Sequence, residues 1–268
     1  MNFWAKLKIK SVQGNSLRPY SRRLLLNLGC GVTFHPDWTN ADLFPAAPGI
    51  LKQNLEKPLR FARESFEGVY HSHVLEHLPK RVGEAFLKEC FRVLRPGGVL
   101  RVVVPDLEAI ARLYIRYCED AWNRASGAAE CHEWMTLELL DQMTRESTGG
   151  EMLRFWRRDP LPAAELVRQR MGAEFLRAVS SSHGGAGTEW RRPGFLSALR
   201  FRRCGEIHRW MYDRASLRLL LEGIGFVGAR VCRADESVIP SFSEFHLDTD
   251  AEGRVRKPDS LFMEALKP

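Results

Sequence analysis

The chain has 268 residues, of which 44% are hydrophobic and 27% are charged. This size and composition are typical of one globular domain, with or without a large insertion, and they exclude a fibrous or intrinsically disordered protein. The formal net charge of +7 is compatible with a solvated basic surface, an anionic acceptor or a nucleic-acid partner, and it does not choose among them.

Cysteine usage and hydropathy indicate the compartment. The six cysteines are scattered and none forms a C-x-x-C pair, which disfavours both a disulfide framework and a zinc knuckle. No run approaches the roughly 18 apolar residues that a membrane span needs. We therefore expect a cytoplasmic protein in which residues 1–22 form an arm packed on the domain. The alternative is a peripheral contact with the inner membrane surface through Phe3, Trp4, Leu7 and Ile9.

The first predicted strands surround a glycine-rich bend. An apolar run over residues 23–28 predicts a buried parallel strand that enters a tight loop at Gly29 and Gly31. Residues 38–43 predict a second strand and residues 50–55 a third. Because the first connection is so short, little helix remains to offer its N-terminus to a phosphate.

The next elements restore a regular alternation of strand and helix. Residues 66–75 predict a strand with its C-terminal loop, and Pro79 opens an amphipathic helix that the Pro-Gly-Gly at 96–98 stops. Residues 99–104 form a β-branched run typical of a central strand, which ends at Pro105.

Residues 107–205 break this alternation. Helical patterns cover residues 107–122, 134–143 and 163–179, and a Gly/Ser-rich stretch follows at 180–187. A segment of this length is too long for a simple crossover. We interpret it as a helical insertion that forms a lid over the acceptor, with the Gly/Ser-rich stretch as its mobile loop.

The α/β pattern returns after the insertion. Residues 213–224 predict an amphipathic helix with Gly225 as its C-cap, and residues 226–232 and 260–266 predict the last two strands, joined by a long polar loop. The expected fold is a Rossmann-like, doubly wound sheet of seven strands, mostly parallel with an antiparallel last strand. Its core comprises residues 23–106 and 206–268, and ligands should bind at the carboxyl ends of the strands.

A glycine pair and an acid mark that edge. Gly29 and Gly31 allow a ligand to approach the backbone, and Asp42 at the end of the second strand could accept both hydroxyls of a ribose. A dinucleotide site is less favoured, because Phe34 stands where the G-x-G-x-x-G fingerprint needs its third glycine.

Four short segments carry a resemblance to a known family: LNLGCG at 26–31, NADL at 40–43, HVLEHL at 73–78 and LRPGG at 94–98. Together they resemble the class I S-adenosyl-L-methionine-dependent methyltransferases of the type 11-like, small-molecule branch. The short first crossover and the segment HRWMYD at 208–213 further resemble a bacterial subgroup associated with surface-polysaccharide biosynthesis.

The resemblance implies a cofactor site and, after transfer, S-adenosyl-L-homocysteine as product. Gly29 and Gly31 would line the methionine and ribose, and Asp42 would hold the ribose hydroxyls. Asn54 and Leu55 would lie by the adenine, and Ser72 and His73 would lie on the floor facing the sulfonium. Asn27 stands where relatives often have an acidic residue, and this departure affects only a water-mediated contact to the amino group of the cofactor. The implied cofactor-binding residues are Asn27, Gly29, Cys30, Gly31, Asp42, Leu43, Asn54, Leu55, Ser72 and His73.

A hydroxyl acceptor would need a general base, and histidine suits that role near neutral pH. The candidates are His73 and His208 first, with His71 and His77 behind them; each could instead be a packed or surface residue. We expect no metal ion, because neither an H-x-x-x-H pattern nor paired acids stand out, Asp106 and Glu108 being the nearest approach.

Aromatic and arginine residues of the insertion suit a sugar face with a phosphate or carboxylate. The alternative is a helical subdomain with its own core and a basic rim. The residues concerned are Trp134, Phe155, Trp156, Phe175, Trp190, Phe195, Arg154, Arg157, Arg158, Arg191, Arg192, Arg202 and Arg203.

The predicted function is O-methylation of a glycan, a sugar precursor or another small molecule. One alternative is an RNA methyltransferase, against which residues 71–74 read His-Ser-His-Val rather than N/D-P-P-Y. The other is a non-catalytic protein that binds the cofactor. The sequence predicts neither the identity of the acceptor nor an oligomeric state.

Overall fold

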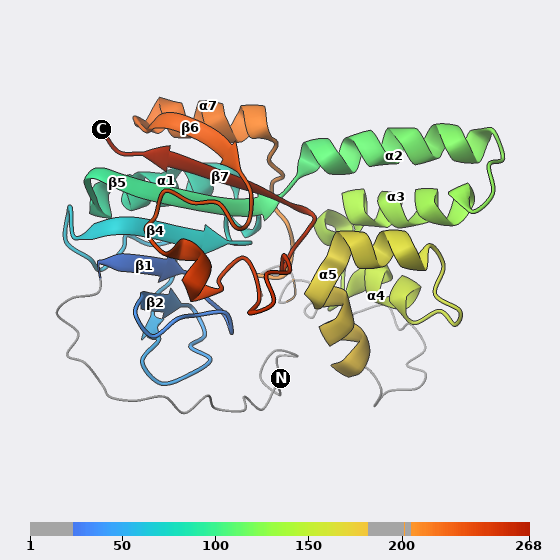
Figure 1. The fold of residues 1–268 in the computed structure, drawn as a ribbon, viewed down its shortest axis with the longest axis horizontal. Coiled ribbons are helices and arrows are strands. Elements are labelled where there is room, and N and C mark those ends of the chain that lie inside the picture. The colour runs from blue at the N-terminus through green and yellow to red at the C-terminus, as the bar shows by residue number, and fades with distance from the viewer. Residues whose placement is uncertain (1–23, 182–200, 202–204) are drawn as a thin grey trace.

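The computed structural model describes residues 24–181, 201 and 205–268. The expected N-terminal arm and most of the Gly/Ser-rich stretch lie outside these residues. Figure 1 shows a twisted sheet beside a group of helices, with the last residues of β5 leading directly into the first of those helices.

The sheet has seven strands in the order β3-β2-β1-β4-β5-β7-β6. Strands β1 to β5 are parallel, and β7 is antiparallel to both of its neighbours, β5 and β6. The predicted fold class is thus confirmed. The strands are β1 (Leu25–Leu28), β2 (Thr39–Asp42), β3 (Leu51–Lys52), β4 (Phe66–Ser72), β5 (Leu94–Pro105), β6 (Val227–Cys232) and β7 (Ser260–Leu266).

Two strands differ in length from the prediction. Strand β5 starts at Leu94 rather than at residue 99, because Gly97 N donates to Lys267 O at 2.8 Å and Lys267 N donates to Gly98 O at 2.9 Å. Strand β3 keeps only Leu51–Lys52, because Asn54 Oδ1 accepts a hydrogen bond from Glu56 N at 2.8 Å and turns the chain.

One face of the sheet is covered by two amphipathic helices, α1 (Lys80–Val93) and α7 (Arg214–Ile224). Their apolar sides, with Phe86 and Leu217 among them, pack against buried strand residues such as Leu28 and Leu100. Helix α7 begins at a capping box formed by Asp213 and Ser216 and ends at Gly225 in the left-handed conformation, which confirms the predicted C-cap.

The opposite face carries an aromatic cluster. Trp38 and Tyr70 have ring centroids 6.0 Å apart, and Phe242 packs against both. Phe242 belongs to the 3₁₀ turn η4 (Phe242–Phe245), within the segment between β6 and β7 that we expected to be a polar loop. Residues 29–38 contain no helix. The segment between β6 and β7 therefore supplies the apolar cover that a helix in a longer first crossover would provide.

A buried arginine fixes that segment to the sheet. Arg101 of β5 is fully buried, and its Nε lies 2.7 Å from Asp248 Oδ2 while its Nη1 lies 2.9 Å from Glu264 Oε1. The guanidinium also donates to the backbone carbonyls of Arg233, Ala234 and Glu236, and Tyr70 donates its hydroxyl to Asp248. A buried charge is tolerated only with such complete pairing.

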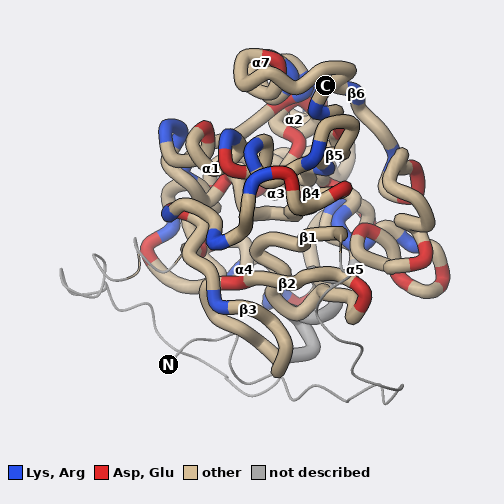
Figure 2. Tube along the Cα trace, turned by 90° about the vertical axis from the view of Figure 1, so that its left-hand side faces the viewer, with Lys and Arg blue, Asp and Glu red and all other residues tan. Residues whose placement is uncertain are grey.

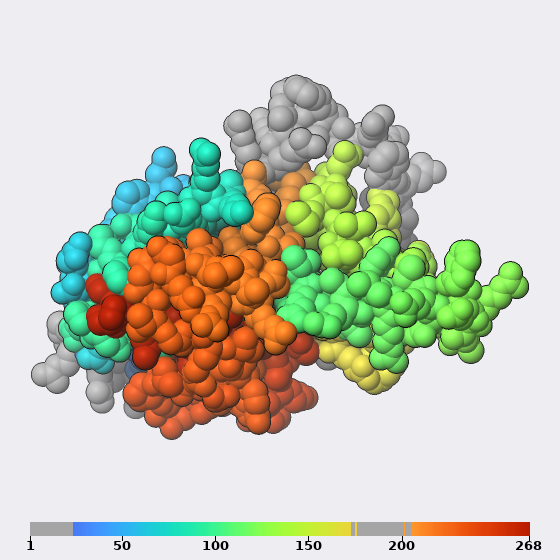
Figure 3. All heavy atoms as spheres, turned by 90° about the horizontal axis from the view of Figure 1, so that it is seen from above, coloured from blue at the N-terminus to red at the C-terminus, as the bar shows by residue number. Residues whose placement is uncertain are grey.

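The insertion folds as a separate helical group, seen from above in Figure 3 to project from the side of the core. Its own core contains Ile110, Trp134, Met135, Phe155 and Val167. Helix α4 was not expected, and α3 begins earlier than residue 134. The described helices are α2 (Leu107–Trp122), α3 (Ala128–Thr144), α4 (Gly150–Trp156) and α5 (Ala164–Ser181).

Within the described part of the chain, no helix combines the length and hydropathy required to cross a bilayer.

Removal of one member of the buried Arg101–Asp248 pair should have a large effect on stability. Asp248→Ala leaves Arg101 buried with an incomplete set of partners, and we expect the free energy of unfolding to fall by about 3–5 kcal/mol. Urea denaturation measures this change. The matched control is Glu222→Ala, which removes an exposed partner 2.7 Å from Arg218 on α7 and should cost about 0.5 kcal/mol or less. Equal losses of unfolding free energy in Asp248→Ala and Glu222→Ala would contradict the stabilising role of the buried Arg101–Asp248 pair.

Candidate functional site

The loops that follow β1, β2 and β4 meet at the carboxyl edge of the sheet. Gly29 N donates to Ala41 O at 2.8 Å, so the chain leaving β1 bends toward the end of β2. Gly31 N donates to Asp42 Oδ2 at 2.9 Å and fixes the bend. The parallel register of β1 with both β2 and β4 brings all three strand ends to this edge.

Gly29 is required by both conformation and space. Its φ is +66°, and a Cβ at this position would lie 2.3 Å from Val74 Cγ2. The glycine therefore allows the loop after β1 to touch the loop after β4. Gly31 also has a positive φ of +51°, but its surroundings are open, because a Cβ at this position would meet no other atom within 4 Å.

Asp42 is half-buried at the end of β2, and its two oxygens each accept one backbone hydrogen bond. Oδ2 accepts from Gly31 N at 2.9 Å and Oδ1 accepts from Phe44 N at 2.8 Å. Each carboxylate oxygen has a second lone pair, so the group can still accept two ligand hydroxyls. Exposed apolar side chains flank it, with Val32 at 44%, Leu43 at 40% and Phe44 at 60% exposure.

The residues expected near an adenine ring, Asn54 and Leu55, follow strand β3. Gln53 N donates to Asp42 O at 2.9 Å, which brings this segment beside the end of β2. Leu55 Cδ1 lies 3.6 Å from the position that a Cβ of residue 29 would take, so Leu55 borders the bend. Asn54 uses its side-chain oxygen to cap the turn at Glu56 N.

Two other predicted cofactor residues are buried behind the bend. Asn27 is 1% exposed and donates to Thr33 O at 3.2 Å and to Asn40 Oδ1 at 3.1 Å, so it holds the short first crossover in place. A role for Asn27 in cofactor binding stays a prediction. Burial, and secondarily Asp42, raises the pKa of the Cys30 thiol to about 12, which keeps it neutral.

His73 follows Ser72 at the end of β4, with its backbone at a positive φ of 52°. Its Nε2 lies 2.8 Å from Ser260 Oγ, and its Nδ1 lies 3.2 Å from Glu76 Oε1. The side chain is 12% exposed. A histidine whose second nitrogen faces a carboxylate is the usual arrangement of an oriented general base.

Two of the other candidate bases are buried. His71 is fully buried in β4 with its ring against Phe86, and burial lowers its pKa to about 3. This environment contradicts a role for His71 as a base that exchanges protons with a substrate. His208 is 4% exposed, and burial together with the neighbouring His77 holds its pKa well below the usual range. His208 therefore packs among buried side chains at the edge of the core, and its role in catalysis stays a prediction.

One group of residues was missed from the sequence. Glu76, His77 and His208 each place a side-chain donor atom within 4.8 Å of the others. The first two are adjacent and His208 is far away in the chain, so no local spacing joins all three. The pattern His73-x-x-Glu76-His77 was the available sign. The pair considered earlier is engaged elsewhere: Asp106 caps α2, and Glu108 pairs with Arg112 and Arg214.

Four of the aromatic residues considered for a sugar face, all within the described part of the insertion, pack in its own core, as the alternative of a helical subdomain expects. Trp134 and Phe155 are fully buried, with ring centroids 5.4 Å apart, and Trp156 packs against Trp134 and Phe175. The described arginines are also partly committed, since Arg154 pairs with Glu151 and Arg158 with Glu133. Residues 190–195 and 202–203 lie outside the described residues.

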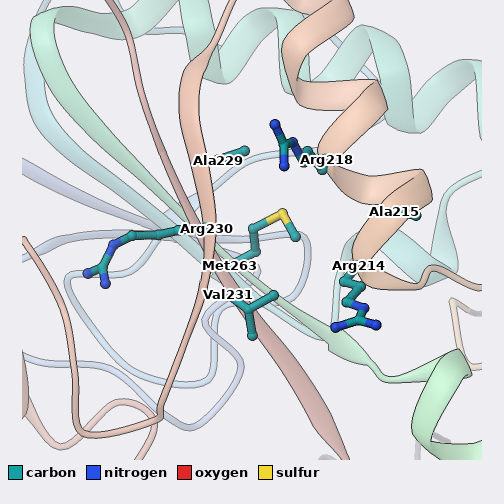
Figure 4. Close-up of a pocket in the computed structure, with 7 residues that line it drawn as sticks. All are labelled: Arg214, Ala215, Arg218, Ala229, Arg230, Val231 and Met263. Carbon is teal, nitrogen blue, oxygen red and sulfur yellow. The ribbon is translucent and has the colours of Figure 1, made fainter.

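Two cavities lie away from this edge. The first, of about 470 Å³, is lined by Arg214, Arg218, Arg230 and Met263 (Figure 4). Each of the three guanidinium groups already has a glutamate partner within 2.8 Å. The second, of about 420 Å³, lies around residues 243–253. Neither is lined by the predicted cofactor residues.

Basic and acidic residues alternate on the face shown in Figure 2, where α1 and the neighbouring strands and loops carry both signs. Surface pairs such as Lys88–Glu84 and Arg95–Glu67 contribute to this mixture. The net positive charge is therefore not gathered on this face into a continuous stripe of the kind that follows a nucleic-acid backbone.

Comparison with known proteins supports a methyltransferase. Residues 26–102 match a family model described as a methyltransferase domain. These residues contain the glycine bend, Asp42 and His73, so the match coincides with the site built above and supports S-adenosylmethionine-dependent methyltransferase activity. No curated protein sequence matches the chain.

Solved structures of methyltransferases share a distant likeness. One from Archaeoglobus fulgidus is 11% identical, with 91% of this chain and 85% of that chain covered and a TM-score of 0.39. One from Mesorhizobium loti is 14% identical, with 90% and 89% covered and a TM-score of 0.38. One from Thermotoga maritima is 12% identical, with 94% and 84% covered and a TM-score of 0.38.

Substitution of Gly29 and of Gly31 by alanine should destabilise the protein to different extents. Gly31→Ala should cost about 1–2 kcal/mol, the cost of a left-handed conformation for a residue with a Cβ. Gly29→Ala should cost a further 1–3 kcal/mol or so, because its Cβ overlaps Val74. Thermal and urea unfolding measure both changes. In a double-mutant cycle, Val74→Ala should recover part of the loss in Gly29→Ala and none in Gly31→Ala; equal losses without recovery would contradict the contact.

Proposed function

We propose that this protein is an S-adenosylmethionine-dependent methyltransferase that transfers a methyl group to a hydroxyl of a glycan, a sugar precursor or another small molecule. One observation carries the proposal: within the residues that match a methyltransferase domain, Asp42 lies hydrogen-bonded across a glycine bend, between exposed apolar side chains. A ribose diol and a purine ring need that combination of groups.

The residues present fit the proposed cofactor. Asp42 would accept the ribose hydroxyls through its remaining lone pairs, and Leu43 and Leu55 would contact the adenine. Gly29 and Gly31 would allow the methionine part to approach the backbone. The cofactor has no phosphate, which agrees with the short first crossover and its lack of a helix N-terminus at the bend.

The bound cofactor would supply an electrophilic methyl group on a sulfonium. Because the departing thioether is neutral, no acid is needed to protonate it, and most of the acceleration must come from alignment, which contributes up to about 7–11 kcal/mol. The chain's own task is to orient the acceptor and to accept its proton. His73 Nε2 is the proposed proton acceptor, and the acceptor hydroxyl would take the place of Ser260 Oγ, which lies 2.8 Å from this nitrogen. Glu76 Oε1, 3.2 Å from Nδ1, would orient and stabilise the ring.

The acceptor class rests on the resemblance of residues 208–213 to a subgroup associated with surface-polysaccharide biosynthesis. A cytoplasmic enzyme, or one held peripherally at the inner membrane surface, would meet the precursors of such glycans. The face shown in Figure 2 offers no continuous basic stripe to an RNA backbone. Labelled methyl transfer into fractionated cell extract, followed by identification of the product, tests the acceptor class directly.

The first prediction concerns cofactor affinity. Asp42→Ala should weaken S-adenosylhomocysteine binding by about 1.5–3 kcal/mol, the usual contribution of hydrogen bonds to a charged group. Isothermal titration calorimetry measures the change, and a thermal melt of the same sample controls for loss of the bend. The matched control is Asp37→Ala, an exposed acid on the same crossover. Unchanged affinity in Asp42→Ala would remove this carboxylate from the site.

The second prediction separates turnover from binding. His73→Ala should lower the turnover of labelled methyl transfer by about 10²–10⁴-fold, the usual contribution of a general base. Cofactor affinity should change much less than turnover, because proton transfer takes no part in cofactor binding. His246→Ala, an exposed histidine after η4, is the control. Undiminished turnover in His73→Ala would exclude it as the base.

A further inference from the structure

A cluster of metal-binding side chains lies beside the proposed site. It consists of Glu76 and His77 in the 3₁₀ turn η3 (Leu75–His77) and of His208, on the segment that returns from the insertion. Their donor atoms all lie within 4.8 Å of one another. The Glu76 side chain is 0% exposed, the His77 side chain is 24% exposed, and His208 is 4% exposed.

Backbone hydrogen bonds from several segments hold the cluster together. Arg209 N and Trp210 N both donate to Glu76 O, at 2.6 and 3.2 Å, and His208 N donates to Gln142 O of α3 at 2.9 Å. The rings of His77 and His208 have centroids 4.9 Å apart. The backbone therefore brings these three residues together at one place in the fold.

The hydrogen bonds of the cluster orient lone pairs inward. His77 Nδ1 lies 3.2 Å from Ile207 O and donates its proton there, so His77 Nε2 keeps a lone pair and lies 3.9 Å from Glu76 Oε1. His73 Nδ1, 3.2 Å from the same oxygen, fixes the carboxylate. Metal-binding histidines almost always donate their second ring N–H to a carbonyl or carboxylate in this way.

We propose that Glu76, His77 and His208 bind one divalent transition-metal ion. Two imidazole nitrogens and one carboxylate oxygen suit Zn²⁺, Co²⁺, Mn²⁺, Fe²⁺ or Ni²⁺, whereas Ca²⁺ and Mg²⁺ prefer sites built from oxygen alone. Three protein ligands leave at least one coordination position for another oxygen.

This inference deepens the proposed function and, for its catalytic role, rests on it. An acceptor hydroxyl in the remaining coordination position would have a lowered pKa and would lose its proton to His73 Nε2, the proton acceptor proposed above. Its oxygen would then form a bond to the methyl carbon, while the sulfur–methyl bond breaks and its electron pair leaves with the neutral thioether. The ion would lie next to His73, toward which the methyl group of the bound cofactor is proposed to point.

Metal binding can be tested without any assay of activity. Full-length protein is stripped with EDTA and titrated with Co²⁺ alone, and the visible d–d absorption of bound cobalt is followed. We expect one Co²⁺ per chain and displacement by one equivalent of Zn²⁺. In His77→Asn, His208→Asn and Glu76→Gln the affinity should fall at least ten-fold or so, whereas His246→Ala should bind as the wild type does.

Each outcome separates the two proposals. Absence of stoichiometric Co²⁺ binding to wild-type protein that still binds S-adenosylhomocysteine overturns the metal site and leaves the proposed function standing. Cobalt binding without any cofactor binding supports the metal site and contradicts the proposed function. Circular dichroism identifies variants that do not fold; if all three fail, the wild-type stoichiometry and the His246→Ala control still decide the question.

Discussion

The candidate site depends on the hydrogen bond that joins the end of β2 to the loop after β1. Asp42 Oδ2 accepts from Gly31 N at 2.9 Å, and this bond sets the bend at the carboxyl edge of the sheet. The bend is possible because Gly29 has no side chain to meet Val74. Strand register, loop conformation and the position of the acid are therefore parts of one arrangement, and the proposed cofactor site is its consequence.

A second junction connects this edge to the helical insertion. The turn η3 after β4 accepts hydrogen bonds from Arg209 and Trp210, and Leu107 N donates to Tyr212 O at 3.0 Å where the insertion leaves β5. The entry and the exit of the insertion are thus tied to the same edge of the sheet. Trp134, Phe155, Trp156 and Phe175 of the insertion pack in its own core.

Much of the fold could be predicted because local sequence patterns determine the individual strands and helices. The apolar runs of β1 and β5 and the amphipathic period of α7 identified the elements, and Gly225 marked the end of α7. The glycine pair and Asp42 could also be placed, because parallel strands end at one edge of the sheet.

Features that depend on distant contacts could not be predicted. The extension of β5 requires Lys267 at the far end of the chain, and burial of Arg101 requires Asp248 from a segment that looked like a polar loop. The cluster of Glu76, His77 and His208 exists only once the insertion has returned to the sheet. Periodicity describes one segment at a time and carries no information about such partners.

The central claim is that the glycine bend and Asp42 hold an adenosine ribose. A crystal structure of the protein with S-adenosylhomocysteine tests it most directly. We expect the ribose hydroxyls within hydrogen-bond distance of the Asp42 carboxylate and the adenine between the apolar side chains beside it. A complex with the ligand elsewhere, or with this edge empty or filled by side chains, would contradict the account.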